Sequence, residues 1–115
     1  MPSDRTDRAL RDILHHIDLA ADFVEGFDRD TFKADLRSVF AVTRCLEIIS
    51  EASRRLPDEI KARYPEIAWK QMAGAGNVYR HDYEDVVAQF IWDTVAHALP
   101  PLRTAIEKEI ANSGG

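Results

Sequence analysis

The spacing of the apolar residues constrains the fold of this chain more than any other feature. From Leu10 to Val24 they recur at intervals of three and four residues, which is the pattern of a helix with one buried stripe. Gly26 then stands where a helix commonly ends. No stretch keeps up the alternation of apolar and polar residues that a half-buried strand requires. The sequence therefore predicts an all-α fold.

Similar patterns predict further helices along the rest of the chain. Capping oxygens in residues 28–31 begin a second helix, which runs to about Arg55 and lies antiparallel to the first because the connection is short. Pro57 and Pro65 each suit the first turn of a shorter helix, where the missing proline N–H would have had no partner. The last long helix begins near Glu84. The prediction is an antiparallel bundle of about five helices.

The last helix has two unusual features. Pro100 and Pro101 should kink or restart it, because a proline ring clashes with the preceding turn. Its apolar face is also broad, since it comprises Val86, Val87, Phe90, Ile91, Thr94 and Val95. The helix could lie at the centre of the bundle, or it could be buried against both the bundle and a second copy of the chain. In the second case Trp69 and Trp92 would be natural interface residues.

Length, charge and cysteine content narrow the class of protein. The 115 residues suit one domain, residues 1–115, with residues 1–5 and 111–115 expected to fray. A formal net charge of −5 argues against a general nucleic-acid coat protein. No apolar run reaches the roughly 18 residues of a membrane span, and no signal-peptide pattern opens the chain. The single cysteine, Cys45, is expected to be buried, and a cytoplasmic location is expected.

The stretch AGAGNVYRHDYE departs from the helical pattern. Two glycines, Gly74 and Gly76, interrupt a predicted helix, and a group of polar residues follows them at once. On a helix Asn77 and His81 would share one face because they are four residues apart. Arg80 would point about 100° away from His81.

Several chemistries stay open from these residues alone. A histidine with a near-neutral pKa can act as a general acid or base, and an amide beside it can orient a phosphate or a water. No second imidazole or thiolate stands at ligand spacing from His81, so a metal site is not expected. The glycines lack the lysine and the preceding strand of a phosphate-binding loop, and no serine stands in a nucleophile elbow. The plainest interpretation is a helix end whose polar groups are satisfied.

At this stretch the sequence resembles the HepT-like branch of the HEPN proteins, the ribonuclease toxins of a type VII-like, two-gene toxin–antitoxin system. The family motif is an arginine and an asparagine, a short spacer, and then histidine–x–tyrosine. Asn77, His81 and Tyr83 match it. Pro65 and Trp69 match the proline–x–x–x–tryptophan that precedes the motif. The likeness runs from RDILHHIDLAADFVEG to VVAQFIWDTVAHALPPLRTAIEKEI, which is nearly the whole chain.

The resemblance implies a homodimer in which the motifs of two protomers meet in one cleft. It implies RNA cleavage there without a metal or another cofactor, with His81 as general acid or base and Asn77 as a positioning amide. Glu51, in EIISEASRRLP, would be an acid behind the residues that touch RNA. The implied partner is a nucleotidyltransferase antitoxin of the MntA type, which would silence the toxin by transferring adenylate to Tyr83.

One position departs from the family motif. The arginine that should precede Asn77 is Gly76 here, and a glycine cannot stabilise the charge of a phosphorane. The glycine could be a natural loss, a substitution made so that a toxic protein can be expressed, or the mark of a reshaped site in which Arg80 supplies the cation. The prediction is a HEPN-type endoribonuclease toxin whose activity Gly76 puts in question. The alternative is a non-catalytic helical dimer that binds a nucleotidyltransferase.

Overall fold

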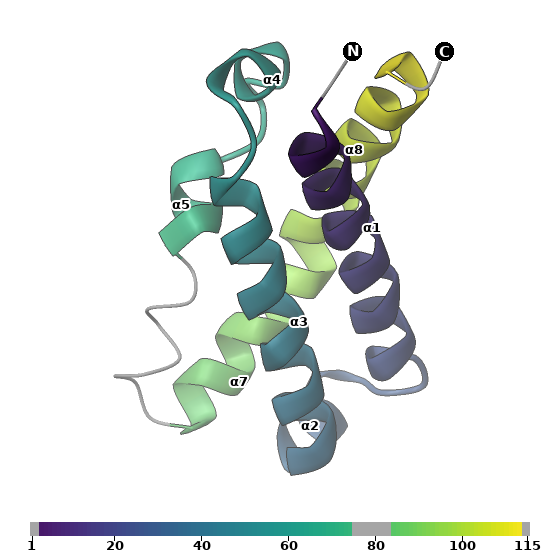
Figure 1. Cartoon of the computed structure of the whole chain (residues 1–115). Helices are drawn as coiled ribbons and strands as arrows, with labels where there is room; N and C mark the ends of the chain where they lie inside the picture. The colour runs from purple at the N-terminus through teal and green to yellow at the C-terminus, as the bar shows by residue number, and fades with distance from the viewer. Residues whose placement is uncertain (1–2, 75–83, 114–115) are drawn as a thin grey trace.

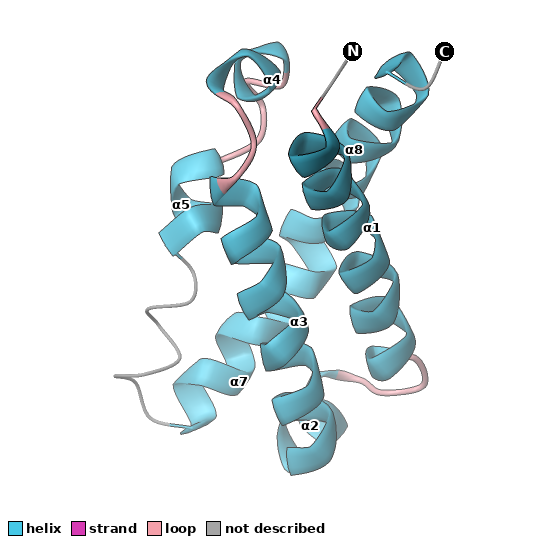
Figure 2. Cartoon of the chain, viewed as in Figure 1, coloured by secondary structure: helices cyan, strands magenta, loops and turns pink. Residues whose placement is uncertain are grey.

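Helices make up almost all of the described part of the chain, which comprises residues 3–74 and 84–113 of this computed structural model. Figure 2 shows the helices joined by loops, and no strand occurs among the described residues. The predicted all-α fold is confirmed. In chain order the helices are α1 (Asp4–Val24), α2 (Arg29–Ala34), α3 (Leu36–Arg54), α4 (Asp58–Arg63), α5 (Trp69–Gly74), α7 (Glu84–Asp93), the π-helix η2 (Thr94–Ala98) and α8 (Leu99–Ser113).

Helices α1, α3 and α8, the longest of the described helices, form the body of the bundle (Figure 1). Helices α1 and α3 are antiparallel, as the short connection predicts, and α8 packs against α1. Helix α5 lies against the C-terminal part of α3, whereas α2 and α7 pack on each other at the opposite end of the bundle. In Figure 1 the end of α5 and the start of α7 lie to the same side of α3.

The terminal helices are longer than the sequence indicates. Ser3 is the N-cap of α1, and its hydroxyl accepts a hydrogen bond from the N–H of Thr6 at 3.1 Å. Residues 3–5, which were expected to fray, thus cap and begin the helix, and α8 continues through Ser113. The other end of α1 is as predicted, because Gly26 follows it with a φ of 86°, which glycine adopts without steric cost.

The single second helix predicted from the sequence is broken in two. The predicted capping at its start is confirmed, since the Asp28 carboxylate accepts a backbone hydrogen bond there at 2.8 Å. The backbone of Asp35 is extended, with φ −102° and ψ 93°, so α2 ends before it and α3 starts after it. The break separates residues that one helix would have placed on one stripe. Phe32 is fully buried, whereas Leu36 and Phe40 are 52% and 65% exposed.

The next two helices differ from the prediction at one boundary. Helix α4 follows Pro57 as expected, but α5 begins at Trp69 instead of Pro65. The indole N–H of Trp69 donates to the carbonyl oxygens of Lys61 and Tyr64, at 3.1 and 3.0 Å. Because both carbonyls belong to the end of α4, the indole closes the turn between the two helices and fixes where α5 starts.

A π-helical turn accommodates the prolines of the last helical run. The N–H of Leu99 donates to the carbonyl of Thr94, five residues earlier, immediately before Pro100 and Pro101. A wider turn relieves the clash between a proline ring and the carbonyl four residues before it. Figure 1 shows the run changing direction between α7 and α8. The kink or restart predicted at the prolines thus takes the form of a π-helical turn immediately before them.

The core lies between the apolar faces of α1, α3, α7 and α8. Its fully buried members include Leu10, Ile13, Ile49, Ile91 and Leu102. Cys45 belongs to this core with 4% of its surface exposed, as predicted, and burial raises the pKa of its thiol.

The broad apolar face of the last helical run is divided between the core and a groove. Ile91 is buried in the core, whereas Phe90 and Thr94 line a hollow that faces α5. The ring of Trp92 packs on that of Phe32, with the ring centroids 5.5 Å apart. Both tryptophans therefore contact residues of their own chain, Trp92 through its ring and Trp69 through its N–H.

Candidate functional site

Most of the residues that the sequence assigns to the site lie outside the described residues. They are Gly76, Asn77, Arg80, His81 and Tyr83. Glu51 is described, and it lies exposed on α3. The chain leaves the described residues at the end of α5 and returns to them at the start of α7, and Glu51 lies on α3.

Two side chains of α3 hold the end of α5. The hydroxyl of Ser50 donates to the carbonyl oxygen of Ala73 at 2.9 Å, and the guanidinium of Arg54 donates to the same oxygen. The carbonyl of Ala73 is among the last four of α5, which have no partner within their own helix. Donors from a neighbouring helix satisfy it instead, and they fix the point at which the chain leaves α5 after Gly74.

The sequence of α3 brings these two donors together. Ser50 and Arg54 are four residues apart, so their side chains lie on one face of the helix. Ser50 is 2% exposed, whereas Arg54 lies at the surface. The contact places a cation at the C-terminal end of α5, where the partial negative charge of a helix end favours it.

Sequence reasoning missed both donors and singled out only the acid between them. Glu51 is three residues before Arg54, but the two side chains do not form an ion pair in the described part of the chain. A serine and an arginine four apart are ordinary on the polar face of a helix, so the only signal was their spacing. Their role depends on which helix packs against that face.

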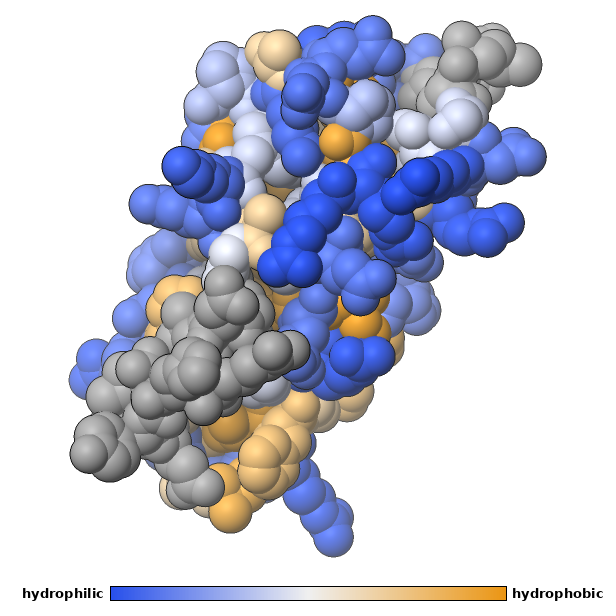
Figure 3. All heavy atoms as spheres, turned by 60° about the vertical axis from the view of Figure 1, so that its left-hand side comes forward, coloured by the Kyte–Doolittle hydropathy of each residue, from blue (hydrophilic) through white to orange (hydrophobic). Residues whose placement is uncertain are grey.

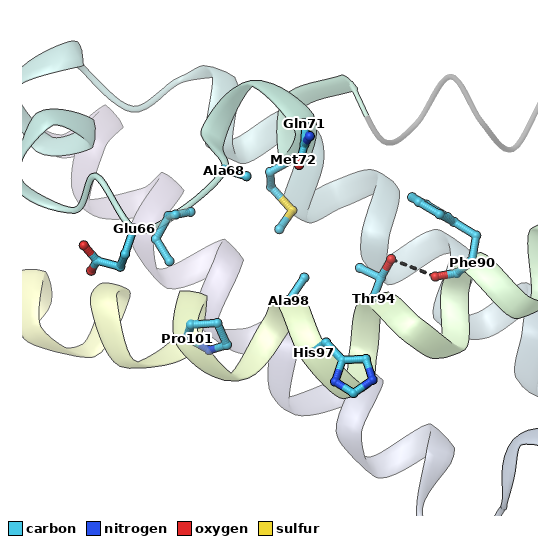
Figure 4. A pocket seen from close by; sticks show the side chains of 10 residues that line it. Glu66, Ala68, Gln71, Met72, Phe90, Thr94, His97, Ala98 and Pro101 are labelled. Carbon is cyan, nitrogen blue, oxygen red and sulfur yellow. Dashed lines mark hydrogen bonds between the residues drawn. The ribbon is translucent and has the colours of Figure 1, made fainter.

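A hollow of about 290 Å³ lies between α5 and the last helical run (Figure 4). Met72 of α5 points into it from one side, and Ala98 and Pro101 lie on the other. The hydroxyl of Thr94 donates to the carbonyl of Phe90 at 2.8 Å, so it is turned toward its own helix. The lining is mostly apolar, which suits packing or docking better than proton transfer.

The surface offers one further feature. Figure 3 shows a mainly hydrophilic face with an apolar patch toward the lower end, the end at which α3 begins in Figure 1. Leu36 and Phe40, the most exposed of the large apolar residues described, are one turn apart on that part of α3. Their exposure leaves apolar area that a partner could cover.

In residues 3–74 and 84–113 no group of three or more His, Cys, Asp or Glu side chains is arranged to hold a metal ion. Over the same ranges, no helix combines the length and the apolar character needed to cross a membrane.

The fold defines the class first: the protein is an all-α, HEPN-like helical bundle. Comparison with family models then gives the family. The model described as "Ribonuclease HepT-like" matches residues 13–109, so this chain belongs to the HepT-like ribonuclease family.

Relatives with ribonuclease names match most or all of the chain. A "Probable ribonuclease HepT" of Thermococcus cleftensis is 37% identical over 99 residues, which cover 86% of this chain and 90% of that protein. A "Putative RNase" of Methanocaldococcus jannaschii is 31% identical over 115 residues, which cover 100% of this chain and 95% of that protein. No solved structure gives a significant match.

Proposed function

We propose that this protein is the toxin of a toxin–antitoxin pair and that it cleaves RNA as a metal-independent, HEPN-type endoribonuclease. The observation that carries the proposal is the match of residues 13–109 to the HepT-like ribonuclease family. The order of Asn77, His81 and Tyr83 in the family motif supports it. The ribonuclease names of the relatives support RNA as the substrate class.

The residue types in the motif suit this chemistry. Cleavage next to a ribose 2′-hydroxyl needs a group that takes the hydroxyl proton, a cation for the charge of the phosphorane and a proton for the leaving oxygen. We assign proton transfer to His81, with the same residue of a second protomer serving the other proton. Asn77 would position the phosphate, and Arg80 is the motif's candidate cation because Gly76 carries no charge. Glu51 would support these groups from α3.

The test of this assignment is RNA cleavage in the presence of a chelator. We expect His81→Ala to abolish cleavage, both in the chain as it stands and in Gly76→Arg, without a change in its helical circular dichroism. His97→Ala is the matched control, because His97 is an exposed imidazole of η2 and is expected to leave cleavage intact. Equal cleavage by His81→Ala and its parent would refute the role of His81.

We further propose that a nucleotidyltransferase antitoxin of the MntA type silences the toxin by adenylylating Tyr83. An adenylate would add bulk and negative charge to a site that must admit an anionic RNA. Intact-protein mass spectrometry after incubation with that partner, ATP and Mg²⁺ should show one added adenylate. Tyr79→Phe should still be modified, and Tyr83→Phe should not. An unchanged mass beside a working control reaction would exclude Tyr83 as acceptor.

The proposal includes a homodimer in the cytoplasm. A second protomer would supply the second histidine, and the exposed apolar side chains of Leu36 and Phe40 support an association surface on α3.

A second candidate function is a non-catalytic helical dimer that binds the nucleotidyltransferase. Gly76 favours it, because the motif cation is missing, and so does the net charge of −5, which opposes RNA binding. This candidate would be favoured if no form of the protein, Gly76→Arg included, cut any RNA of a broad panel while all forms stayed folded.

A further inference from the structure

We propose that Arg54 binds a phosphate of the RNA and thereby brings to the site, from α3, a cation that the motif lacks at Gly76. The inference rests on the proposed function, because it adds a residue to the same RNA site. It extends that site from the motif onto α3.

The position of Arg54 suits a contact with RNA. The guanidinium of Arg54 is anchored on the carbonyl oxygen of Ala73, at the end of α5. Ala73 is three residues before Gly76, so the Cα atoms of the two residues lie within about 11 Å of each other in any conformation of the chain. The charge of Arg54 is therefore held where the polypeptide passes from α5 into the motif.

The guanidinium of Arg54 is also accessible to a ligand. Arg54 is exposed, and among the described residues no carboxylate forms an ion pair with it. Other arginines are engaged by acids: Arg63 pairs with Glu109 at 2.6 Å, and Arg103 pairs with Asp18 at 2.9 Å. Among the described residues Arg54 donates only to Ala73. A guanidinium has five N–H donors, and arginine can bind a phosphate through two of them.

The side chain of Arg54 is restrained before any ligand binds. A long side chain that must be immobilised on binding loses part of the affinity it could provide. The bond to Ala73 already restrains Arg54, and the bond from the buried Ser50 to the same oxygen holds that carbonyl in place. The phosphate-binding group is thus partly ordered before RNA arrives.

The test is the salt dependence of RNA binding, measured by fluorescence anisotropy with a labelled, single-stranded 2′-O-methyl RNA. This RNA is not cut, because the attacking hydroxyl is blocked. Each phosphate contact to a single strand contributes about 0.7 to the slope of log affinity against log salt concentration. We expect Arg54→Gln, which keeps a donor for Ala73 but loses the charge, to lower the slope by about 0.7. Arg54→Lys, which keeps the charge, should retain the parental slope.

Two control variants separate charge from structure. Ser50→Ala removes the other donor to Ala73 and should leave the slope unchanged. Arg44→Gln removes a cation of the same helix whose side chain is 70% exposed, and it should also leave the slope unchanged.

An unchanged slope in Arg54→Gln, with a parent that binds RNA, would overturn the inference and leave the proposed function standing. An equal loss of slope in Ser50→Ala would overturn it as well, because Arg54 would then act by holding α5. A parent that binds no RNA would refute the proposed function and the inference together.

Discussion

At the scale of single residues, two glycines differ in what the fold requires of them. Gly26 has a φ of 86°, a region that other residues rarely adopt. Gly74 ends α5, and a Cβ placed on it would meet no atom of the described residues within 4 Å. Neither backbone conformation nor space therefore requires a glycine at position 74.

These glycines should respond to alanine in opposite ways. Gly74→Ala is expected to leave the free energy of unfolding unchanged or to raise it by up to about 1 kcal/mol, because alanine restricts the unfolded chain more. Gly26→Ala is expected to lower it by about 1 kcal/mol, because of the positive φ. Urea unfolding of both variants measures these changes. A clear loss of stability in Gly74→Ala would contradict the open surroundings described for it.

The sequence predicts single residues well where their partners are local. The capping role of Asp28 and the helix-ending role of Gly26 depend on contacts within a few residues, and both are confirmed. The bond from Ser50 to Ala73 joins residues 23 apart and exists only because α5 packs on α3. No local pattern could have predicted it.

At the scale of elements, a buried carboxylate of α8 connects this helix to the end of α4 through a hydrogen bond and an ion pair. Glu109 is 5% exposed, accepts a hydrogen bond from the hydroxyl of Tyr64 at 3.1 Å and pairs with Arg63 at 2.6 Å. Burial, and after it the hydrogen bond to Glu109, raises the pKa of Tyr64 above its ordinary value of 10.0. The neutral phenol is therefore the form that the folded protein stabilises.

The contact between Tyr64 and Glu109 predicts that the folded protein loses stability at alkaline pH. Because the folded pKa of Tyr64 is above the unfolded one, its contribution is complete below pH 10.0 and is lost as the pH rises through the folded pKa. The free energy of unfolding should fall less in Tyr64→Phe than in the parent between about pH 9 and about pH 11. Chemical unfolding across this range is the measurement. Identical pH dependence in the two proteins would argue against the contact.

Element types were easier to predict than element boundaries. The apolar period identified α1 and the last helical run because it reports a buried face directly. The apolar period could not place the break at Asp35. Phe32, Leu36 and Phe40 fit the period of one continuous helix equally well. The start of α5 at Trp69 depends on an indole bond to the end of α4, which is again a tertiary contact.

At the scale of the whole molecule, the apolar surface on α3 predicts self-association. A charge at Phe40, which is 65% exposed, should cost the folded monomer little but should oppose burial in a dimer. We expect Phe40→Glu to raise the dimer dissociation constant at least tenfold, which is about 1.4 kcal/mol. Analytical ultracentrifugation measures this. Phe23→Glu, at a 40% exposed residue of α1, is the control that should stay dimeric.

A Phe40→Glu protein that dimerises like its parent would show that the dimer uses another surface, and the groove between α5 and the last helical run would be the next to test.

The family and the fold class could both be predicted from the sequence, since they depend on patterns that extend along nearly all of the chain. The RNA contact proposed for Arg54 of α3 could not be predicted from the sequence. It arises only when Arg54 and the end of α5, which are 19 residues apart, are brought together in the folded molecule.

The most direct measurement is RNA cleavage in chelator by three purified forms: the chain as it stands, Gly76→Arg, and Gly76→Arg with His81→Ala. If the fold is a ribonuclease with a missing motif cation, Gly76→Arg should cut at least about 10²-fold faster than the chain as it stands, the effect of one charge-stabilising group. The double variant should lose this cleavage, because it lacks the proton-transferring His81. Equal cleavage rates of the double variant and Gly76→Arg would contradict this account. The absence of cleavage by every folded form would contradict it as well.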